Sequence, residues 1–400
     1  MTKKTDTPAI RFKGFSDTWE QRKLTEFVEF FSGLTYTPND VQENGTLVLR
    51  SSNVSNGEVV DADNVYVNPQ VVNSENVKVG DIVVVVRNGS RSLIGKHAQI
   101  KAFMPNTVIG AFMTGIRSEC PEFTNALLNT SRFEEEIAMN MGATINQITG
   151  YMFSKMEFKV PCLDEQKKIG EYFEKLDNLI TLHQRKYEKL HNIKKSMLEK
   201  MFPKNGSNVP EIRFKGFTEA WEQRKLGDCF TERVESMPDG ELISVTINDG
   251  IKKFSELGRH DNSNDDKSKY KKVCIGDIAY NSMRMWQGAS GYSPYEGIVS
   301  PAYTVLSPNS GINSKCLAYQ FKLPEMIHTF QINSQGITSD NWNLKYPALS
   351  EIEIFVSRNE KEQAKISEYF EVLDRLITLH QRELEKLQNI KKSMLEKMFV

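Results

Sequence analysis

The chain has 400 residues, of which 39% are hydrophobic and 26% are charged, with a formal net charge of −1 at pH 7. This composition excludes a disordered, collagen-like or disulfide-rich chain and predicts a globular protein of two or three domains. The five cysteines lack metal-ligand spacing, the first 15 residues lack the apolar core of a signal peptide, and no apolar run could span a bilayer, so we expect reduced thiols in a cytoplasmic protein.

The first predicted element is a short head that occurs twice. Ile10–Phe15 reads IRFKGF and Trp19–Leu24 reads WEQRKL, and both sequences return at Ile212–Phe217 and Trp221–Leu226. A repeat with so long a period is a whole module made twice rather than a solenoid unit. The sequence therefore predicts two tandem modules, each with a head, a variable stretch and a helix.

The two variable stretches, residues 25–161 and 227–357, match only at scattered points. Val79–Ile82 pairs with Ile275–Ile278 through a shared Gly-Asp-Ile, which predicts a tight turn entering a strand. Short β-branched runs bounded by Gly, Asn, Ser and Pro predict further strands, with short helices between them. We expect each stretch to form one α/β domain on a mixed, mostly antiparallel sheet.

A long helix is predicted at the end of each module. Residues 166–202 and 363–399 are closely similar, and their last parts, 192–202 and 389–399, are identical. Neither copy contains Pro or Gly beyond its first turn, and apolar residues recur about every 3.5 positions, which predicts a coiled coil. The end of the first helix leads into the second head, so symmetry predicts that the end of the second helix lies near the first head. The helices should then be antiparallel.

These elements predict an α+β fold of two pseudo-two-fold-related α/β domains joined by two long antiparallel helices that form a coiled coil. The expected segments are domain 1 (1–161), a central spacer helix (162–202), a linker (203–211), domain 2 (212–358) and a C-terminal spacer helix (359–400).

Identity between the copies extends to helix residues that a core would not constrain. Two interpretations stay open: a surface that binds the same partner twice, or recent recombination between the copies. Lys194 and Lys391 also fall on the apolar seam, where they are expected to extend outwards or to mark where the seam opens to a partner. The candidate partner-binding residues are Gln184, Arg185, Lys194, Lys195, Gln381, Arg382, Lys391 and Lys392.

With these motifs the chain resembles, over essentially all its residues, the specificity (S) subunit of type I restriction–modification enzymes. The resemblance is carried by the two heads, the Gly-Asp-Ile strand starts, the Ile-Lys-Lys-Ser-Met-Leu sequences of the helices, and the Glu-Gln pairs at 165–166 and 362–363. It implies that each variable domain is a target-recognition domain that reads one half of a bipartite, asymmetric DNA site. The helices would act as a spacer and as docking surfaces for two modification (methyltransferase) subunits, which restriction subunits then join. The resemblance also places S-adenosylmethionine, ATP and Mg on those partner subunits.

Base reading needs Arg, Lys, Asn, Gln, Ser or Thr on loops that face a groove of the duplex. Two regions of each domain offer these side chains: the stretch after the Gly-Asp-Ile strand and the stretch before the helix-leading strand. The candidate DNA-binding residues are Arg87, Asn88, Ser90, Arg91, Lys96, Thr144, Asn146 and Gln147 in domain 1, and Asn281, Ser282, Arg284, Trp286, Gln287, Ser339, Asn341 and Asn343 in domain 2. Solvated polar loops are the other interpretation.

No complete active-site motif is present in the sequence. Gly89–His97 resembles a phosphate loop but has one residue too many and a histidine where Ser or Thr should hold magnesium. Tyr292–Tyr295 resembles an adenine-methyltransferase motif but lacks the amide or carboxylate that holds the base. We therefore expect a non-catalytic subunit with no metal of its own. The competing class is a coiled-coil scaffold whose variable domains bind proteins.

Overall fold

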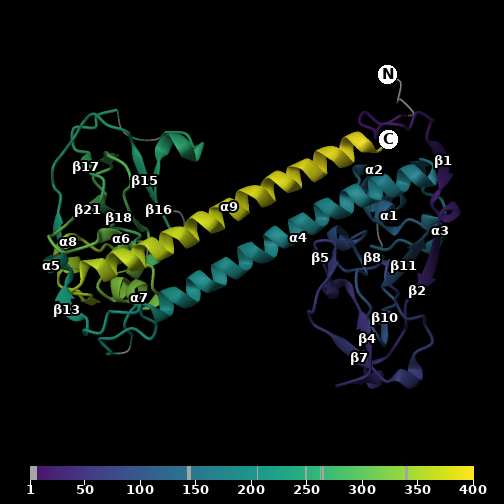
Figure 1. Cartoon of the computed structure of the whole chain (residues 1–400), viewed down its shortest axis with the longest axis horizontal. Helices are drawn as coiled ribbons and strands as arrows, with labels where there is room; N and C mark the ends of the chain where they lie inside the picture. The colour runs from purple at the N-terminus through teal and green to yellow at the C-terminus, as the bar shows by residue number, and fades with distance from the viewer. Residues whose placement is uncertain are drawn as a thin grey trace. The chain divides into compact units, whose positions relative to one another are not determined.

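The computed structural model describes residues 7–141, 146–204, 206–247, 250–261, 263, 265–337 and 341–400. The chain forms two compact units (Figure 1). The first unit contains Met1–Gln184 and Arg382–Val400, and the second contains Arg185–Gln381. Each unit therefore holds one variable domain and a part of both long helices, α4 (Leu163–Lys200) and α9 (Glu360–Met398). No helix among the described residues is long and apolar enough to cross a membrane.

The two long helices run antiparallel within the first unit. Phe173 of α4 packs against Phe399, which follows α9, with ring centroids 5.9 Å apart. One turn further along α4, Asp177 pairs with Lys391 at 2.6 Å. The partner's residue number falls as the number in α4 rises, so the predicted antiparallel order is confirmed here.

The second unit repeats this arrangement with the roles of the helices exchanged. Phe202, which follows α4, stacks on Phe370 of α9 at 6.2 Å, and Lys194 pairs with Asp374 at 2.5 Å. Both lysines that the heptad pattern places on the seam therefore point to a carboxylate of the facing helix. The expectation that they extend outwards is wrong, because each is half-buried in an ion pair between the helices.

The heads fasten both helices in each unit. In the first unit the backbone N–H of Ile10 donates to the carbonyl of Lys397 at the end of α9 (2.9 Å). The Arg11 guanidinium meets the carboxylate of Glu165, at the start of α4, through two hydrogen bonds of 2.7 Å. Trp19 packs edge-on against Phe399. The end of the second helix thus lies on the first head, as symmetry predicts.

The second head makes the same contacts. Ile212 N–H donates to the carbonyl of Lys200 (2.9 Å), and Arg213 pairs with Glu362, which is completely buried. Each head also supplies a strand: β1 (Glu20–Lys23) pairs antiparallel with β12 (Glu157–Val160), and β13 (Glu222–Lys225) pairs antiparallel with β22 (Glu353–Val356). Since β12 and β22 lead directly into the long helices, head and helix form one frame.

The continuous helix α4 contains a glycine at the point where another helix approaches closely. Because α4 begins at Leu163, Gly170 lies beyond its first turn, contrary to the expectation from the sequence. A Cβ atom at this position would be 2.7 Å from the backbone nitrogen of Phe123, in α1 (Pro121–Leu128). A glycine inside a helix costs about 0.5–1 kcal/mol relative to alanine, and here it makes room for α1.

The first variable domain contains two four-stranded sheets rather than the single sheet expected. The antiparallel sheet has the order β2 (Val28–Ser32), β11 (Met113–Ser118), β8 (Ile82–Val85), β9 (His97–Gln99). The mixed sheet has the order β10 (Thr107–Ile109), β4 (Thr46–Leu49), β7 (Val65–Val67), β3 (Val41–Gln42), with β10 and β4 parallel. A hairpin of β5 (Val54–Ser55) and β6 (Glu58–Val59) and the helices α1, α2 (Ser131–Asn140) and α3 (Gly150–Phe153) complete the domain.

Among its described residues, the second variable domain repeats the antiparallel sheet, whereas a second four-stranded sheet is not formed. The antiparallel sheet has the order β14 (Phe230–Glu232), β21 (Tyr303–Pro308), β18 (Ile278–Asn281), β19 (Ser290–Tyr292), which matches the first domain strand for strand. Two hydrogen-bonded strand pairs stand beside it, β15 (Ile243–Thr246) with β16 (Gly250–Lys253) and β17 (Lys271–Val273) with β20 (Gly297–Val299). The helices are α5 (Leu226–Cys229), α6 (Ser314–Gln320), α7 (Pro324–Ile332) and α8 (Tyr346–Ser350). The common sheet is thus the part of both domains that carries the Gly-Asp-Ile motif.

Candidate nucleic-acid interface

The Gly-Asp-Ile motif builds a rigid turn at the start of the strand that leads to each candidate loop. In the first domain Gly80 has φ 94°, a left-handed conformation that favours glycine. The buried carboxylate of Asp81 accepts the N–H of Lys78 (2.8 Å) and two hydrogen bonds from Arg117 (2.9 and 3.1 Å). These contacts raise the pKa of Arg117 further above its usual range. The motif is therefore structural, and it fixes where β8 begins.

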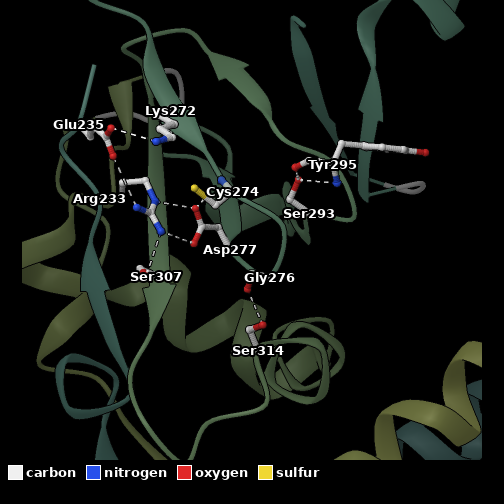
Figure 2. Close-up of polar contacts among 10 residues, drawn as sticks. All are labelled: Arg233, Glu235, Lys272, Cys274, Gly276, Asp277, Ser293, Tyr295, Ser307 and Ser314. Atoms are coloured by element: carbon white, nitrogen blue, oxygen red, sulfur yellow. Dashed lines mark hydrogen bonds and ion pairs between the residues drawn. The ribbon is translucent and has the colours of Figure 1, made fainter. Parts of the chain in front are cut away.

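The second domain repeats this turn with an arginine from a different strand. Gly276 has φ 98°, and the Asp277 carboxylate accepts the N–H of Cys274 (2.8 Å). Figure 2 shows Arg233, which follows β14, in a two-pronged contact with Asp277 at 2.7 and 3.0 Å, and reaching Ser307. In the first domain the equivalent arginine lies on β11 instead. In both domains an arginine thus neutralises an aspartate that is almost completely buried.

The two candidate regions of the first domain lie side by side. The N–H of Ile148 donates to the carbonyl of Val86 (2.8 Å), and the N–H of Asn88 donates to the carbonyl of Asn146 (3.4 Å). The side-chain amide of Asn146 also donates to the carbonyl of Gly89 (3.0 Å). These bonds bring residues 87–91 and 146–147, far apart in the sequence, onto one surface.

Several candidate side chains on this surface are accessible. Arg87 is exposed and stacks over the ring of Phe112, with its guanidinium carbon 5.0 Å from the ring centre. Ser90 and Arg91 are exposed, and Arg91 opens the short 3-10 helix η5 (Arg91–Leu93). A planar guanidinium held by an aromatic ring keeps its hydrogen-bond donors free to point outwards, as bidentate recognition of a base requires.

The remaining described candidates of the first domain are less accessible to solvent. Asn88 is half-buried, and its amide donates to Ser51 (3.0 Å) while its oxygen accepts the N–H of Ser90. Lys96 and Gln147 are half-buried. Thr144 lies outside the described residues. Asn88 therefore shapes the loop in this structure rather than extending from it.

The two regions of the second domain meet in the same way. The N–H of Leu344 donates to the carbonyl of Ser282 (2.9 Å), which matches the bond between Ile148 and Val86. Trp286, in the 3-10 helix η7 (Met285–Gln287), packs edge-on against Trp342 with ring centroids 5.2 Å apart. Arg284, the residue before η7, is exposed. In both domains, two stretches that are far apart in the sequence therefore lie on one surface.

One candidate of the second domain is buried and therefore cannot contact DNA. Ser282 is 7% exposed, and its hydroxyl pairs with that of Thr304 inside the protein (2.9 Å), so it supports the loop and cannot reach a groove. Ser339 lies outside the described residues. The other candidates of the second domain are exposed or half-buried; they are Asn281, Trp286, Gln287, Asn341 and Asn343.

Two aromatic residues of these surfaces were not found from the sequence. Phe112, 56% exposed, carries Arg87, and Trp342 pairs with Trp286. The sequence held one signal for Phe112, because Gly110–Phe112 aligns loosely with Pro301–Tyr303. In the structure the carbonyl of Phe112 accepts the N–H of Arg87 (3.2 Å). Trp342 stands between two candidate asparagines, but base reading by hydrogen bonds does not select tryptophan.

The methyltransferase-like motif Tyr292–Tyr295 forms a turn after β19. The buried hydroxyl of Ser293 donates to the carbonyl of Tyr295 (2.8 Å), and Figure 2 shows the Tyr295 side chain extending away from Ser293. Lys253 lies 5.4 Å from the centre of the Tyr295 ring. The hydroxyl of this motif is thus used to close a turn.

A second repeated surface lies on the long helices. In the second unit a shallow groove of about 500 Å³ on α4 has Ile193 and Met197 on its floor. In the first unit the corresponding part of α9 has a groove of the same volume with Ile390 and Met394. The groove residues are identical at every position; they are Arg185, Glu188, Lys189, Asn192, Ile193, Ser196 and Met197 on α4, and Arg382, Glu385, Lys386, Asn389, Ile390, Ser393 and Met394 on α9.

Comparison with known proteins gives a consistent family. The sequence model of the type I restriction modification DNA specificity domain matches residues 16–192 and 218–389. Over 172 residues the chain is 28% identical to the StySPI specificity subunit of a type I restriction enzyme from Salmonella potsdam, and 27% identical to the EcoKI specificity subunit from Escherichia coli K12. Each match covers 40% of this chain and only 36% of the relative's length.

A solved structure shows the same fold over the whole chain. The S subunit of a type I restriction–modification system from M. genitalium superposes with a TM-score of 0.65 and 14% identity, covering 98% of this chain and 99% of that chain. The arrangement of two α/β domains and two long helices is therefore one that this structural neighbour shares.

Proposed function

Because the chain belongs to the family of type I restriction modification DNA specificity domains, we propose that it is the DNA-recognition subunit of a type I restriction–modification complex. In this proposal each variable domain reads one half of a bipartite, asymmetric site on double-stranded DNA. The chain itself carries out no chemistry. Methylation and cleavage, with S-adenosylmethionine, ATP and Mg, belong to its modification and restriction partners.

The observation that carries this proposal is the convergence of the two loop regions in each domain. The same backbone frame, anchored at Asp81 and Asp277, presents Arg87 on Phe112 in one domain and the exposed Arg284, just before η7, in the other. Two like frames that present unlike side chains suit the reading of two unlike half-sites. Phosphate contacts would fix the position, while these side chains would read bases.

The two identical grooves support docking of two copies of one partner. Each has an apolar floor and a rim of charged and amide side chains, which suits an amphipathic helix laid into a groove. We infer that each groove receives one modification subunit. The candidate residues Gln184, Lys195, Gln381 and Lys392 are close in sequence to these grooves, and Arg185 and Arg382 line them.

The test of DNA reading uses the full chain assembled with the modification subunits. Cells carrying Arg87→Ala or Arg284→Ala are surveyed for methylated adenines, which gives the target of each variant. A lost bidentate contact to a base costs about 1–3 kcal/mol, so each variant should relax one half of the target and leave the other unchanged. Lys155→Ala, at a lysine outside the candidate set that lies over the ring of Tyr151, serves as the control. Targets that stay the same in both variants would exclude these arginines as readers. Failure of the wild-type assembly to bind DNA with any sequence preference would favour a protein-binding scaffold.

The test of docking uses stoichiometry. Ile193→Glu places a charge on the floor of one groove, and Ile390→Glu does the same in the other. Native mass spectrometry should show two modification subunits on the wild-type chain, one on each single variant and none on the double variant. Two subunits on the double variant would contradict docking in the grooves.

A further inference from the structure

A lysine beneath the candidate reading surface of the second domain joins two separate loops. Lys322 follows α6, and its ammonium donates to the carbonyl of Gly288 (2.6 Å) and to the carbonyl of Ile247 (3.1 Å). Gly288 ends η7, which carries Trp286, and Ile247 follows strand β15. One side chain thus ties the reading loop to the β15–β16 hairpin.

Gly288 is the point where the reading loop turns back into the sheet. Its φ is 81°, and a Cβ atom there would be 3.2 Å from Ile327, so a larger residue would be both strained and crowded. The next residue, Ala289, donates its N–H to the carbonyl of Arg284 (3.2 Å) and closes the loop. Holding the carbonyl of Gly288 therefore holds the segment from Arg284 to Gln287.

The ammonium of Lys322 is strongly affected by its surroundings. Burial, together with the nearby charge of Lys194, lowers the pKa of Lys322 to about 8. Lys194 is itself paired with Asp374 and lies 5.7 Å from the ring centre of Tyr319. The other described titratable side chains on the packed elements are Arg284 before η7, Lys252 and Lys253 on β16, Lys315, Cys316 and Tyr319 on α6, and Glu325 and His328 on α7.

The first domain holds the equivalent carbonyl without a charge. Gly95, with φ 86°, ends the corresponding loop, and its carbonyl accepts a hydrogen bond from Nδ1 of His97 (3.0 Å). Nε2 of His97 lies 3.1 Å from the side-chain amide of Asn129, which follows α1 as Lys322 follows α6. Burial lowers the pKa of His97. A neutral imidazole with its proton on Nδ1 fits both bonds, since Nε2 then accepts from the amide.

We propose that Lys322 is a positioning residue for base reading by the second domain, and that its protonated ammonium holds the reading loop in place. The first domain does the same task with the neutral pair of His97 and Asn129. This inference rests on the proposed function, because it concerns how one half of the DNA site is read. Lys322 itself lies under the loop and touches no base in this account.

The direction of the pH dependence follows from the proton that the ammonium carries. As pH rises through about 8, Lys322 loses this proton and its two bonds lose their charge assistance. The neutral tether of the first domain does not change above pH 7, because burial lowers the pKa of His97 below its ordinary value. Only the second half-site should therefore be read less strictly at high pH.

The experiment measures discrimination at each half-site separately. The full chain, assembled with modification subunits, is titrated with duplexes in which one base pair of one half-site is changed, at about pH 7 and about pH 9.5. Discrimination at the second half-site should fall by about ten-fold in the wild type at high pH, the value of one charged hydrogen bond. Discrimination at the first half-site is the internal control and should stay the same.

Two variants separate positioning from general stability. Lys322→Arg stays charged, so its discrimination at the second half-site should not depend on pH. Lys322→Met should lack that discrimination at both pH values while it still reads the first half-site, which also shows that the chain is folded. A wild-type second half-site as insensitive to pH as the first, or full discrimination by Lys322→Met, would overturn the proposal. Loss of reading at both half-sites in the wild type at pH 7 would instead remove the proposed function.

Discussion

The two arginine–glutamate pairs under the heads predict a stability difference between the units. Arg11 is 14% exposed, Glu165 is completely buried, and two hydrogen bonds of 2.7 Å join them. The bond to Glu165 raises the pKa of Arg11, so this guanidinium keeps its charge. Arg11→Ala would leave a buried carboxylate without its counter-charge, which typically costs about 3–5 kcal/mol.

The second unit should lose less from the matching change. The carboxylate of Glu362 also accepts a hydrogen bond of 2.5 Å from Ser357, which survives in Arg213→Ala. The corresponding position in the first unit is Pro161, which has no hydroxyl. A hydrogen bond to a charged group contributes about 1.5–3 kcal/mol, so we expect Arg213→Ala to cost roughly 1–3 kcal/mol, clearly less than Arg11→Ala.

Hydrogen exchange measures the two units separately, which a single unfolding curve of the whole chain cannot do. Peptides from β12 and the start of α4 report on the first unit, and peptides from β22 and the start of α9 report on the second. The double variant Arg11→Leu with Glu165→Leu is the control, since replacing a buried pair by apolar residues is often close to neutral. A cost below about 1 kcal/mol for Arg11→Ala, or equal costs in the two units, would refute the reasoning.

Three further outcomes follow from single contacts. Arg233→Met leaves the buried Asp277 without its arginine and should lower the stability of the second domain by about 3–5 kcal/mol, measured as faster hydrogen exchange in β18. Glu235→Gln, at the exposed end of the same network, should have little effect. Gly115→Ala should cost about 1–3 kcal/mol or more in thermal unfolding, because the new Cβ would be 2.0 Å from the Phe31 ring, while Gly89→Ala, with open space around it, should cost much less. Burial raises the pKa of Cys229 to about 11 and raises that of Cys316 further, so a maleimide at neutral pH should modify the exposed Cys162 first. Peptide mass spectrometry that finds Cys229 or Cys316 labelled before Cys162 would contradict this burial.

The frame of the molecule was readable from the sequence because its features are local or repeated. The heptad spacing predicted α4 and α9, and the shared Gly-Asp-Ile predicted the equivalent strands β8 and β18. The duplicated heads also predicted which helix end meets which head. Each of these conclusions needs only a pattern within one segment or the comparison of two copies.

The contacts between distant segments were not readable in the same way. Asp81 finds its arginine on β11, whereas Asp277 finds its arginine after β14, so no shared position marks the partner. The direction of Lys194 depends on the register of two antiparallel helices, which places Asp374 opposite it. A heptad pattern gives the seam of one helix and says nothing of the register between two.

The structure also bears on why the two copies diverge so unevenly. Several repeated residues of the heads have partners inside their own unit, such as Arg11 with Glu165, and packing accounts for their identity. On the helices, the residues of the groove are repeated while some of their neighbours are not. Arg185 and Glu188 in the groove are unchanged in the second copy, while Lys186 between them is replaced by Glu383.

The same alternation continues one turn further along the helices. Lys189 and Asn192 of the groove are repeated as Lys386 and Asn389, while the exposed His191 beside them becomes Gln388. A partner that contacts the groove twice would constrain the groove positions and leave their neighbours free to change. Beyond these positions, however, residues 192–202 and 389–399 are identical without a break, and recombination between the copies would also leave a continuous identical segment. Both interpretations of the repeat are thus consistent with the sequence, and the groove itself is tested by a matched pair of variants: Lys186→Glu, unlike Ile193→Glu, should leave the stoichiometry of modification subunits unchanged.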